Sequence, residues 1–201
     1  MQMTPRLGVA LAIIQALLLA VFLLPASAQA AVETYELQKA ESQLLFSCAA
    51  TLHGIQGEAK EYQSEVQYDA DQLHLNLPAE VSIAVAGMTT GNKLRDRSMR
   101  KMFSAKDHPK IHWQLTSWNC PTVVAGKAAT CSGVGVLTIR RISKKMALPF
   151  EFSMKDKRLY ISADTQVNLA DFQLKAPAMI GLIKVDKVIH IHLDTVWARA
   201  E

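Results

Sequence analysis

Alternation of apolar and polar residues is the dominant pattern along this chain. A period of two is typical of β-strands that bury one face. It predicts strands at residues 44–52, 62–68, 73–77, 81–85, 111–115, 146–152, 159–167 and 188–197. The short polar turns between them favour an antiparallel sheet. A sheet of this many strands must bury its apolar face, either against a second sheet or by closing into a barrel.

The same alternation predicts which side chains point into the fold. The clearest inward faces are Ile111, Trp113 and Leu115; Met146, Leu148, Phe150 and Phe152; and Ile189, Ile191, Leu193 and Thr195. The last of these runs places His190, His192 and Asp194 on the opposite face. A barrel of about eight strands has an interior that side chains fill, or that holds one small ligand. Alternation identifies the buried face but does not separate these two cases.

Residues 89–113, TTGNKLRDRSMRKMFSAKDHPKIHW, interrupt the alternation. Asn92 is a suitable N-cap for one short helix that runs to about Ala105. An apolar stripe should face the barrel, and basic residues should occupy the other sides. The stripe comprises Leu94, Ser98 and Met102, with Met99 and Phe103 beside it, and the basic residues are Arg95, Arg97, Arg100 and Lys101. The helix is then either a plug over one end of the barrel or a flexible gate at the mouth of a cavity.

The first 30 residues have a different pattern. Arg6 precedes the apolar run LGVALAIIQALLLAVFLL, and small residues ending in Ala28-Gln29-Ala30 follow. This order is typical of a secretory signal peptide, with cleavage before Ala31. The apolar run is also about long enough for a membrane anchor, but Pro25 and the small residues favour cleavage. Residues 31–201 then form a single exported domain.

The three cysteines, Cys48, Cys120 and Cys131, all lie beyond the predicted cleavage site. Exported proteins can retain disulfides. If Ala125-Gly126 is the tip of a two-residue hairpin turn, Cys120 and Cys131 face each other across the two strands. This geometry suits a disulfide, which we therefore predict. Cys48 is left as a buried thiol that packs like a small apolar side chain.

Charge and motifs argue against several classes of function. The chain has 22 Lys and Arg, of which only Arg6 precedes residue 31, against 18 Asp and Glu. The resulting balance is too mild for a nucleic-acid-binding protein. We find no nucleophile elbow, H-E-x-x-H motif or Gly-rich phosphate loop, so no catalytic residues, enzyme activity or cofactor are predicted. His190 and His192, with Asp194, resemble part of a metal site, but an outward polar face is favoured because no further ligand is signalled.

Residues of the interrupting segment match a known family pattern without a gap. They are Thr90-Gly91-Asn92, Arg95-Asp96, Met99, Phe103 and Pro109, followed by Ile111 and Trp113. With weaker matches over nearly all of residues 31–201, the chain resembles the YceI-like family. These are exported lipocalin-like barrels associated with polyisoprenoid or quinone-type lipids. The chain departs from the family at Leu169, where an Arg is usual, and at Gln38 and Glu41, where Asp and His are usual.

The resemblance implies an all-β fold, an antiparallel lipocalin-like β-barrel with one short helical segment near its mouth. It also implies a periplasmic carrier that binds a long apolar lipid, such as a polyisoprenoid or an isoprenoid quinone, without catalysis. The alternative is a periplasmic interaction or stress-related protein whose barrel is packed by its own side chains. An enzyme acting on a lipid is a third class, for which the sequence offers no catalytic set.

Alternation and the resemblance together suggest which residues contact the ligand. The expected apolar contacts are Met99, Phe103, Trp113, Phe150 and Phe152. Asp96 is expected to pair with the adjoining turn or a strand, and Arg95 either does the same or meets a polar head group. The basic helix also predicts transient contact with anionic head groups of a membrane.

Overall fold

The computed structural model describes residues 32–51, 53–69, 74–120, 126–176 and 185–200. These residues belong to the compact unit Ala31–Glu201. The predicted signal peptide, residues 1–30, lies outside the described residues and stays a prediction. No helix in the described part of the chain is long and apolar enough to cross a membrane.

The described elements are mostly strands, joined by short helical segments. The strands are β1 (Val32–Leu37), β2 (Gln43–Cys48), β3 (Ile55–Ala59), β4 (Tyr62–Asp69), β5 (His74–Ala84), β6 (Met88–Thr89), β7 (Lys110–Asn119), β8 (Ala129–Ile139), β9 (Ile142–Lys155), β10 (Arg158–Asn168) and β11 (Val188–Arg199). The helical segments are the α-helix α2 (Lys93–Met102) and the single 3₁₀ turns η1 (Lys39–Glu41), η2 (Val85–Gly87) and η3 (Leu169–Phe172).

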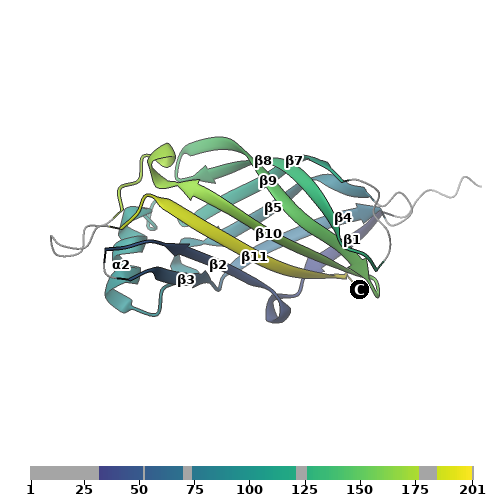
Figure 1. The fold of residues 1–201 in the computed structure, drawn as a ribbon, viewed down its shortest axis with the longest axis horizontal. Helices are drawn as coiled ribbons and strands as arrows, with labels where there is room; N and C mark the ends of the chain where they lie inside the picture. Colours follow the sequence, from purple (N-terminus) through teal and green to yellow (C-terminus); the bar gives the residue numbers. More distant parts are fainter. Residues whose placement is uncertain (1–31, 52, 70–73, 121–125, 177–184, 201) are drawn as a thin grey trace, which may run out of the picture. The chain divides into compact units, whose positions relative to one another are not determined.

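The strands form one antiparallel sheet that closes on itself. Their order around the closed part is β1-β4-β5-β7-β8-β9-β10-β11, and β1 pairs with β11 through the partners Tyr35–Arg199 and Leu37–Trp197. Figure 1 shows these strands wrapping around a common axis, with α2 at one end and the C-terminus at the other. The predicted all-β antiparallel barrel with one short helix is therefore confirmed.

Three positions in the wall of the barrel are each occupied by two strands that lie end to end. β1 pairs with the last part of β11 and β2 pairs with residues 190–194 of the same strand, so β1 and β2 lie end to end on either side of η1. β3 and β4 continue each other in the same way, as do β5 and β6 on either side of η2. The wall thus continues through β2, β3 and β6 to the end of the barrel that carries α2.

Most of the predicted strands are present, but the strand expected at 44–52 ends at Cys48, and alternation did not predict β1, β3 or the short β6. Residues 73–77 and 81–85 were expected as separate strands, but residues 74–84 form the single strand β5. Alternation did not predict β8, because two of its inward positions are glycines. A Cβ at Gly135 would lie 2.5 Å from Cζ2 of Trp113, so the absence of a side chain there makes room for the indole ring.

The predicted helix is present, but its end and its inward face differ from the prediction. The Asn92 side chain caps α2 by accepting hydrogen bonds from the backbone N–H groups of Leu94 and Arg95, each at 3.1 Å. The helix ends at Met102 rather than near Ala105, because Ser104 adopts a left-handed φ of 52°. Leu94 was expected to face the barrel, yet it is 70% exposed.

The inward face of α2 is instead formed by Arg95, Met99, Met102 and, at the C-cap, Phe103. The physical reason is the buried carboxylate of Asp96, which bonds to the segment before the helix and fixes the rotation of the helix about its axis.

The end of the barrel opposite α2 is tightly packed. Tyr35, Tyr68, Phe152, Leu159 and Trp197 are each 3% exposed or less. The rings of Tyr35 and Tyr68 meet edge to face at 6.0 Å, and those of Tyr68 and Phe152 lie 5.8 Å apart. We call these residues the aromatic end of the barrel.

The disulfide lies at the same end. Cys120 and Cys131 are bonded, with their Cα atoms 4.3 Å apart, as the sequence predicted. The proposed turn at Ala125-Gly126 falls partly on residues 121–125, outside the described residues, so its type stays a prediction. Cys48 is a free, buried thiol, also as predicted.

Candidate functional site

The interior of the barrel is not completely filled. A cavity of about 160 Å³, here called cavity 1, lies beneath α2. Its lining residues come from the helix and from almost every surrounding strand. They include Phe46, Cys48, Ile55, Met88, Thr90, Arg95, Met99, Met102, Phe103, Ile111, Ile139, Leu169 and Ile189. Among the described lining residues, only Thr90, Arg95 and the Cys48 thiol carry hydrogen-bonding groups in their side chains.

A second cavity, cavity 2, lies deeper in the barrel and measures about 170 Å³. Apolar and aromatic side chains dominate its lining as well. They include Tyr62, Val66, Val81, Trp113, Leu115, Met146, Leu148, Phe150, Ile161, Leu193 and Trp197. Trp197 connects this cavity to the aromatic end, and its indole Nε1 donates a 3.1 Å hydrogen bond to Oγ1 of Thr195.

The two cavities meet inside the barrel. Their linings share Leu44, Ile83, Leu137, Val167 and Ile191, which come from β2, β5, β8, β10 and β11. Because these strands lie on different sides of the barrel, their side chains form a ring around its axis. The arrangement is one apolar interior divided by this ring, running from α2 toward the aromatic end.

Asp96 fixes the polar part of cavity 1. Its carboxylate accepts hydrogen bonds from Oγ1 of Thr89 at 2.7 Å, from N of Thr90 at 2.7 Å and from Oγ1 of Thr90 at 2.6 Å. Burial alone would raise the pKa of Asp96, but the hydrogen bonds from Thr90 and Thr89 outweigh it, so the pKa lies below its usual value. The prediction that Asp96 pairs with the adjoining turn agrees with this geometry.

Arg95 stands next to this network and lines cavity 1. Its Nε donates to Oγ1 of Thr90 and its Nη2 to the Thr90 carbonyl, both at 3.0 Å. A guanidinium has five N–H donors, so these two bonds hold the side chain in place while leaving it further capacity to donate. Arg95 therefore pairs with the adjoining turn, which was one of its two expected roles. Its contact with a polar head group stays a prediction.

The structure separates the residues predicted to contact a ligand into three places. Arg95, Met99 and Phe103 line cavity 1, and Trp113 and Phe150 line cavity 2. Phe152 lines neither cavity, because it is 1% exposed and packs against Tyr68 and Trp118 at the aromatic end. Whether any of these residues contacts a ligand stays a prediction.

Several lining residues were not predicted. Met102 belongs to the helix stripe but was not chosen, although it lies three residues after Met99 and thus on the same face. Met88 and Thr90 lie in the short segment before the helix, where alternation gives no signal. Leu169, at the position where the family usually has an Arg, is 4% exposed and makes cavity 1 more apolar.

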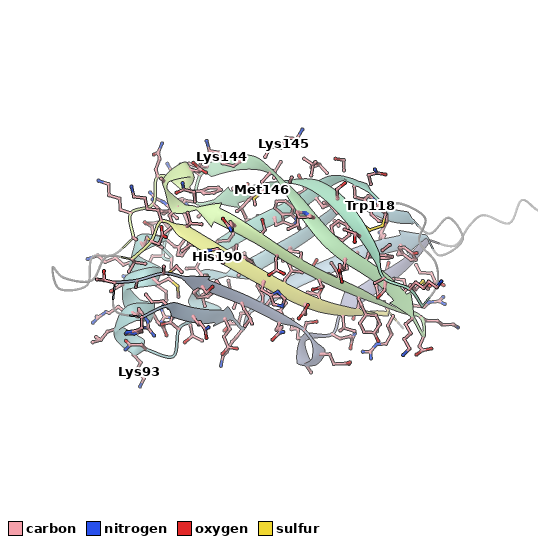
Figure 2. All side chains as sticks on the ribbon, in the orientation of Figure 1. Lys93, Trp118, Lys144, Lys145, Met146 and His190 are labelled. Carbon is pink, nitrogen blue, oxygen red and sulfur yellow. A yellow bond between two sulfur atoms is a disulfide. The ribbon has the colours of Figure 1, made fainter. Side chains whose placement is uncertain are left out.

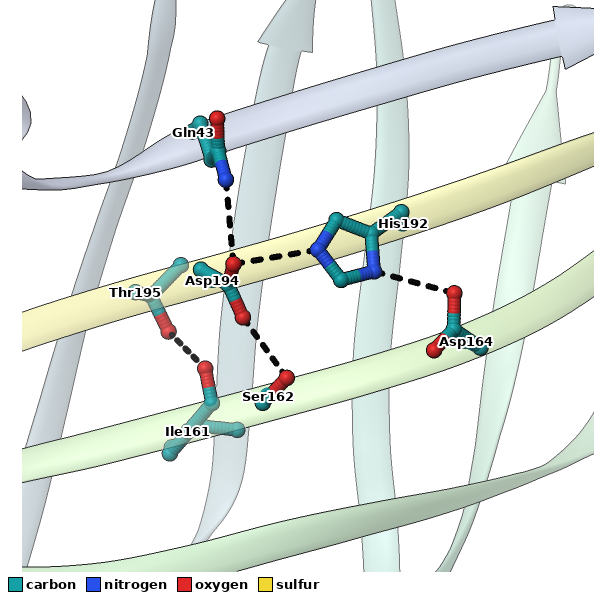
Figure 3. Close-up of polar contacts among 7 residues, drawn as sticks. All are labelled: Gln43, Ile161, Ser162, Asp164, His192, Asp194 and Thr195. Atoms are coloured by element: carbon teal, nitrogen blue, oxygen red, sulfur yellow. Dashed lines mark hydrogen bonds and ion pairs between the residues drawn. The ribbon is translucent and has the colours of Figure 1, made fainter.

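The histidine face of β11 points away from the cavities, as alternation predicted. Figure 3 shows His192 between two carboxylates, with Nδ1 2.9 Å from Oδ1 of Asp164 and Nε2 3.0 Å from Oδ2 of Asp194. These bonds to Asp164 and Asp194 raise the pKa of His192. Hydrogen bonds from Ser162 and Gln43 lower the pKa of Asp194. No group of three His, Cys, Asp or Glu side chains among the described residues is arranged to hold a metal ion.

Comparison with known proteins decides the family. Residues 35–197 match the model of the YceI-like domain. The chain belongs to the YceI-like family. No curated protein sequence matches it significantly.

Solved structures share the fold of this YceI-like protein at low sequence identity. A polyisoprenoid-binding domain from Saccharophagus degradans, implicated in plant cell wall breakdown, has a TM-score of 0.70 at 12% identity and covers 83% of this chain and 98% of its own. BcnA from Burkholderia cenocepacia has a TM-score of 0.64 at 16% identity, covering 80% and 98%. A YCEI protein from Campylobacter jejuni has a TM-score of 0.60 at 20% identity, covering 75% and 88%.

Proposed function

We propose that this YceI-like protein carries a long apolar lipid, such as a polyisoprenoid or an isoprenoid quinone, in the interior of its barrel and performs no chemistry on it. The observation that carries the proposal is the pair of adjoining apolar cavities 1 and 2. Their position along the barrel suits an extended chain rather than a compact ligand. The polyisoprenoid-binding domain from Saccharophagus degradans, which shares the fold, supports the same ligand class.

The size of the cavities favours an occupant over an empty interior. Each cavity, at about 160 and 170 Å³, is roughly tenfold larger than the space that one water molecule needs. The side chains that line an empty apolar cavity lack packing partners on that side and so lose dispersion contacts. A lipid chain would restore the missing contacts and remove its own apolar surface from water, at about 25 cal/mol per Å². This argument weighs against the alternative of a barrel packed by its own side chains.

Arg95 and Thr90 suggest where the polar end of the ligand lies. They are the hydrogen-bonding residues of cavity 1 next to α2, while the aromatic end offers a packed apolar surface. In the proposed complex the tail therefore points toward the aromatic end. Arg95 donates to an oxygen of the head group, such as a quinone carbonyl, a hydroxyl or a phosphate.

The proposed setting is the periplasm. The disulfide between Cys120 and Cys131 supports an oxidising compartment. The pattern of residues 1–30 supports export through a signal peptide.

Native mass spectrometry, followed by organic extraction, tests the proposal. Protein purified gently from the cells that make it should carry a stoichiometric isoprenoid or quinone adduct. Val167 lies in the ring shared by both cavities, so Val167→Phe should fill the interior and reduce the adduct by at least about tenfold, since overpacking opposes insertion of a chain.

The matched control is Gln166→Phe, one residue earlier on the same strand and exposed. It should keep the adduct, and thermal melting followed by circular dichroism should show that both variants are folded. A clean mass for the unmodified protein would contradict lipid carriage and support the packed-barrel interaction protein. Equal loss of adduct in the two variants would argue against binding in the interior.

A further inference from the structure

The helix α2 has two chemically different faces. Its inner face lines cavity 1 through Arg95, Met99 and Met102. Its outer face is exposed and consists of Lys93, Leu94, Arg97 and Lys101. Leu94, at 70%, is the one large apolar side chain that is strongly exposed among the described residues. We call these four residues the outer face of α2.

The net positive charge of the chain is concentrated around this helix. Residues 89–110 contain seven Lys and Arg but two Asp and Glu, a balance of +5. The remainder of the chain has 15 Lys and Arg against 16 Asp and Glu, a balance of −1. The whole-chain charge of +4 is therefore a local property of this segment.

Internal bonds determine which of these charges point outward. Asp96 is 6% exposed and bonded to Thr89 and Thr90, so its carboxylate does not oppose an approaching anion directly. Arg95 is held by Thr90, and Arg100 donates to the carbonyl of Ala86 at 3.1 Å.

On α2 itself, Lys93, Arg97 and Lys101 remain, spaced by four residues and thus aligned on one side of the helix. Lys106, Asp107 and Lys110 are also exposed but lie beyond the end of the helix. Leu94 lies on the same side as Arg97 and Lys101, at spacings of three and seven. Figure 2 shows Lys93 projecting from the α2 end of the barrel.

We propose that the outer face of α2 docks on an anionic lipid bilayer. Lys93, Arg97 and Lys101 bind the negative surface, and Leu94 enters the head-group region between them. A bilayer fits this face better than an acidic protein does. A protein partner would need a larger apolar patch to pack against, whereas a single apolar side chain among cations can enter the head-group region of a bilayer. Docking would serve to load or release cargo through cavity 1, and this role rests on the proposed lipid carriage. The binding to the bilayer does not depend on that proposal.

Vesicle sedimentation tests the docking. The full chain is expressed, the soluble processed protein is purified, and its N-terminus is defined by intact mass. It should sediment with vesicles that contain phosphatidylglycerol, less so in high salt, and not with vesicles of phosphatidylcholine alone. The triple variant Lys93→Glu, Arg97→Glu and Lys101→Glu should weaken binding on the order of a hundredfold, from about 1 kcal/mol per cation. Leu94→Ser should weaken it severalfold without changing the charge.

A matched triple variant controls for net charge. Lys127→Glu, Lys155→Glu and Lys157→Glu change the charge equally, on exposed residues at the opposite end of the barrel. This variant should bind vesicles nearly as well as the unmodified protein. Equal weakening of both triples, or no binding of the unmodified protein to anionic vesicles, would overturn the proposal; the second outcome would leave an acidic protein as the partner.

The lipid content of the same preparations separates the two proposals. Vesicle binding by protein that carries no lipid adduct would contradict lipid carriage alone. An adduct on protein that ignores anionic vesicles would contradict docking alone.

Discussion

The carboxylate of Asp96 accepts three hydrogen bonds although the residue is only 6% exposed. A buried carboxylate is costly unless its oxygens are bonded. Hydrogen bonds to a charged group contribute about 1.5–3 kcal/mol in proteins. These hydrogen bonds hold the first turn of α2 against β6 and Thr90. Asp96 therefore positions the helix residues that line cavity 1.

Replacing Asp96 should reveal this role. We expect Asp96→Asn to lower the free energy of unfolding at neutral pH by about 2 kcal/mol, because an amide cannot accept all three bonds. The folded-state pKa of Asp96 is lowered from 3.8, so its contribution is complete above that value and disappears as the pH falls through the lower, folded-state pKa. Urea unfolding at neutral and at strongly acidic pH measures both effects.

Asp107 offers a matched control on the same segment, because it is exposed. Asp107→Asn should change the free energy of unfolding by less than about 0.5 kcal/mol. If Asp96→Asn still had a lower free energy of unfolding than the unmodified protein under strongly acidic conditions, the assigned role would be contradicted.

At the scale of elements, α2 was predictable in its existence but not in its orientation. Asn92 marks its start in the sequence, and the helical spacing of Met99 and Met102 marks its apolar side. The stripe through Leu94 was wrong, because a helix this short offers two overlapping apolar sides. The choice between them depends on Asp96 and its threonine partners, a tertiary contact that periodicity does not contain. Alternation gave no signal for β8 for a related reason, since Gly133 and Gly135 occupy inward positions where alternation expects large side chains. Only the predicted hairpin between Cys120 and Cys131 placed Cys131 on a strand.

Stability measurements can check the assigned orientation of the helix. We expect Met99→Ala, which removes a buried side chain at 8% exposure, to lower the free energy of unfolding by about 2 kcal/mol or more. Leu94→Ala should change it by less than about 0.5 kcal/mol, because the side chain is 70% exposed and both residues are good helix formers. Chemical denaturation of the two variants measures the difference. A larger loss of unfolding free energy for Leu94→Ala than for Met99→Ala would contradict this orientation and favour the predicted stripe through Leu94.

For the whole molecule, alternation assigned inward and outward faces correctly but did not distinguish packed core from cavity. Phe150 and Phe152 illustrate the limit, since they lie on one face of β9 with the same sequence signal. Both rings contact Trp118, but Phe150 also lines cavity 2, whereas Phe152 lines neither cavity and packs against Tyr68 as well. The distinction depends on strands that are far apart in the chain and meet only when the barrel closes.

Cys48 provides a reporter for the occupancy of the barrel. Its thiol lines cavity 1, and burial, followed by the nearby Asp186, raises its pKa, so it should react slowly at neutral pH. We expect N-ethylmaleimide to modify Cys48 severalfold faster after organic extraction of the protein than before, because a bound chain would block the cavity. Intact mass over time measures the rate.

Cys120 and Cys131 serve as the internal control for this labelling, since a disulfide does not react with maleimide. Thermal melting must show that extraction leaves the protein folded. Equal rates before and after extraction, with a lipid adduct seen only before, would mean that the lipid does not occupy cavity 1.

The aromatic end has a kinetic consequence for the proposed carrier. Tyr35, Tyr68, Phe152 and Trp197 close the barrel on that side, so a bound chain must leave by the route through which it came. An incoming molecule cannot push the resident one out ahead of it, as it could in an open tube. Exchange then proceeds through an empty intermediate, and its rate is set by departure of the old cargo, however abundant the new cargo is.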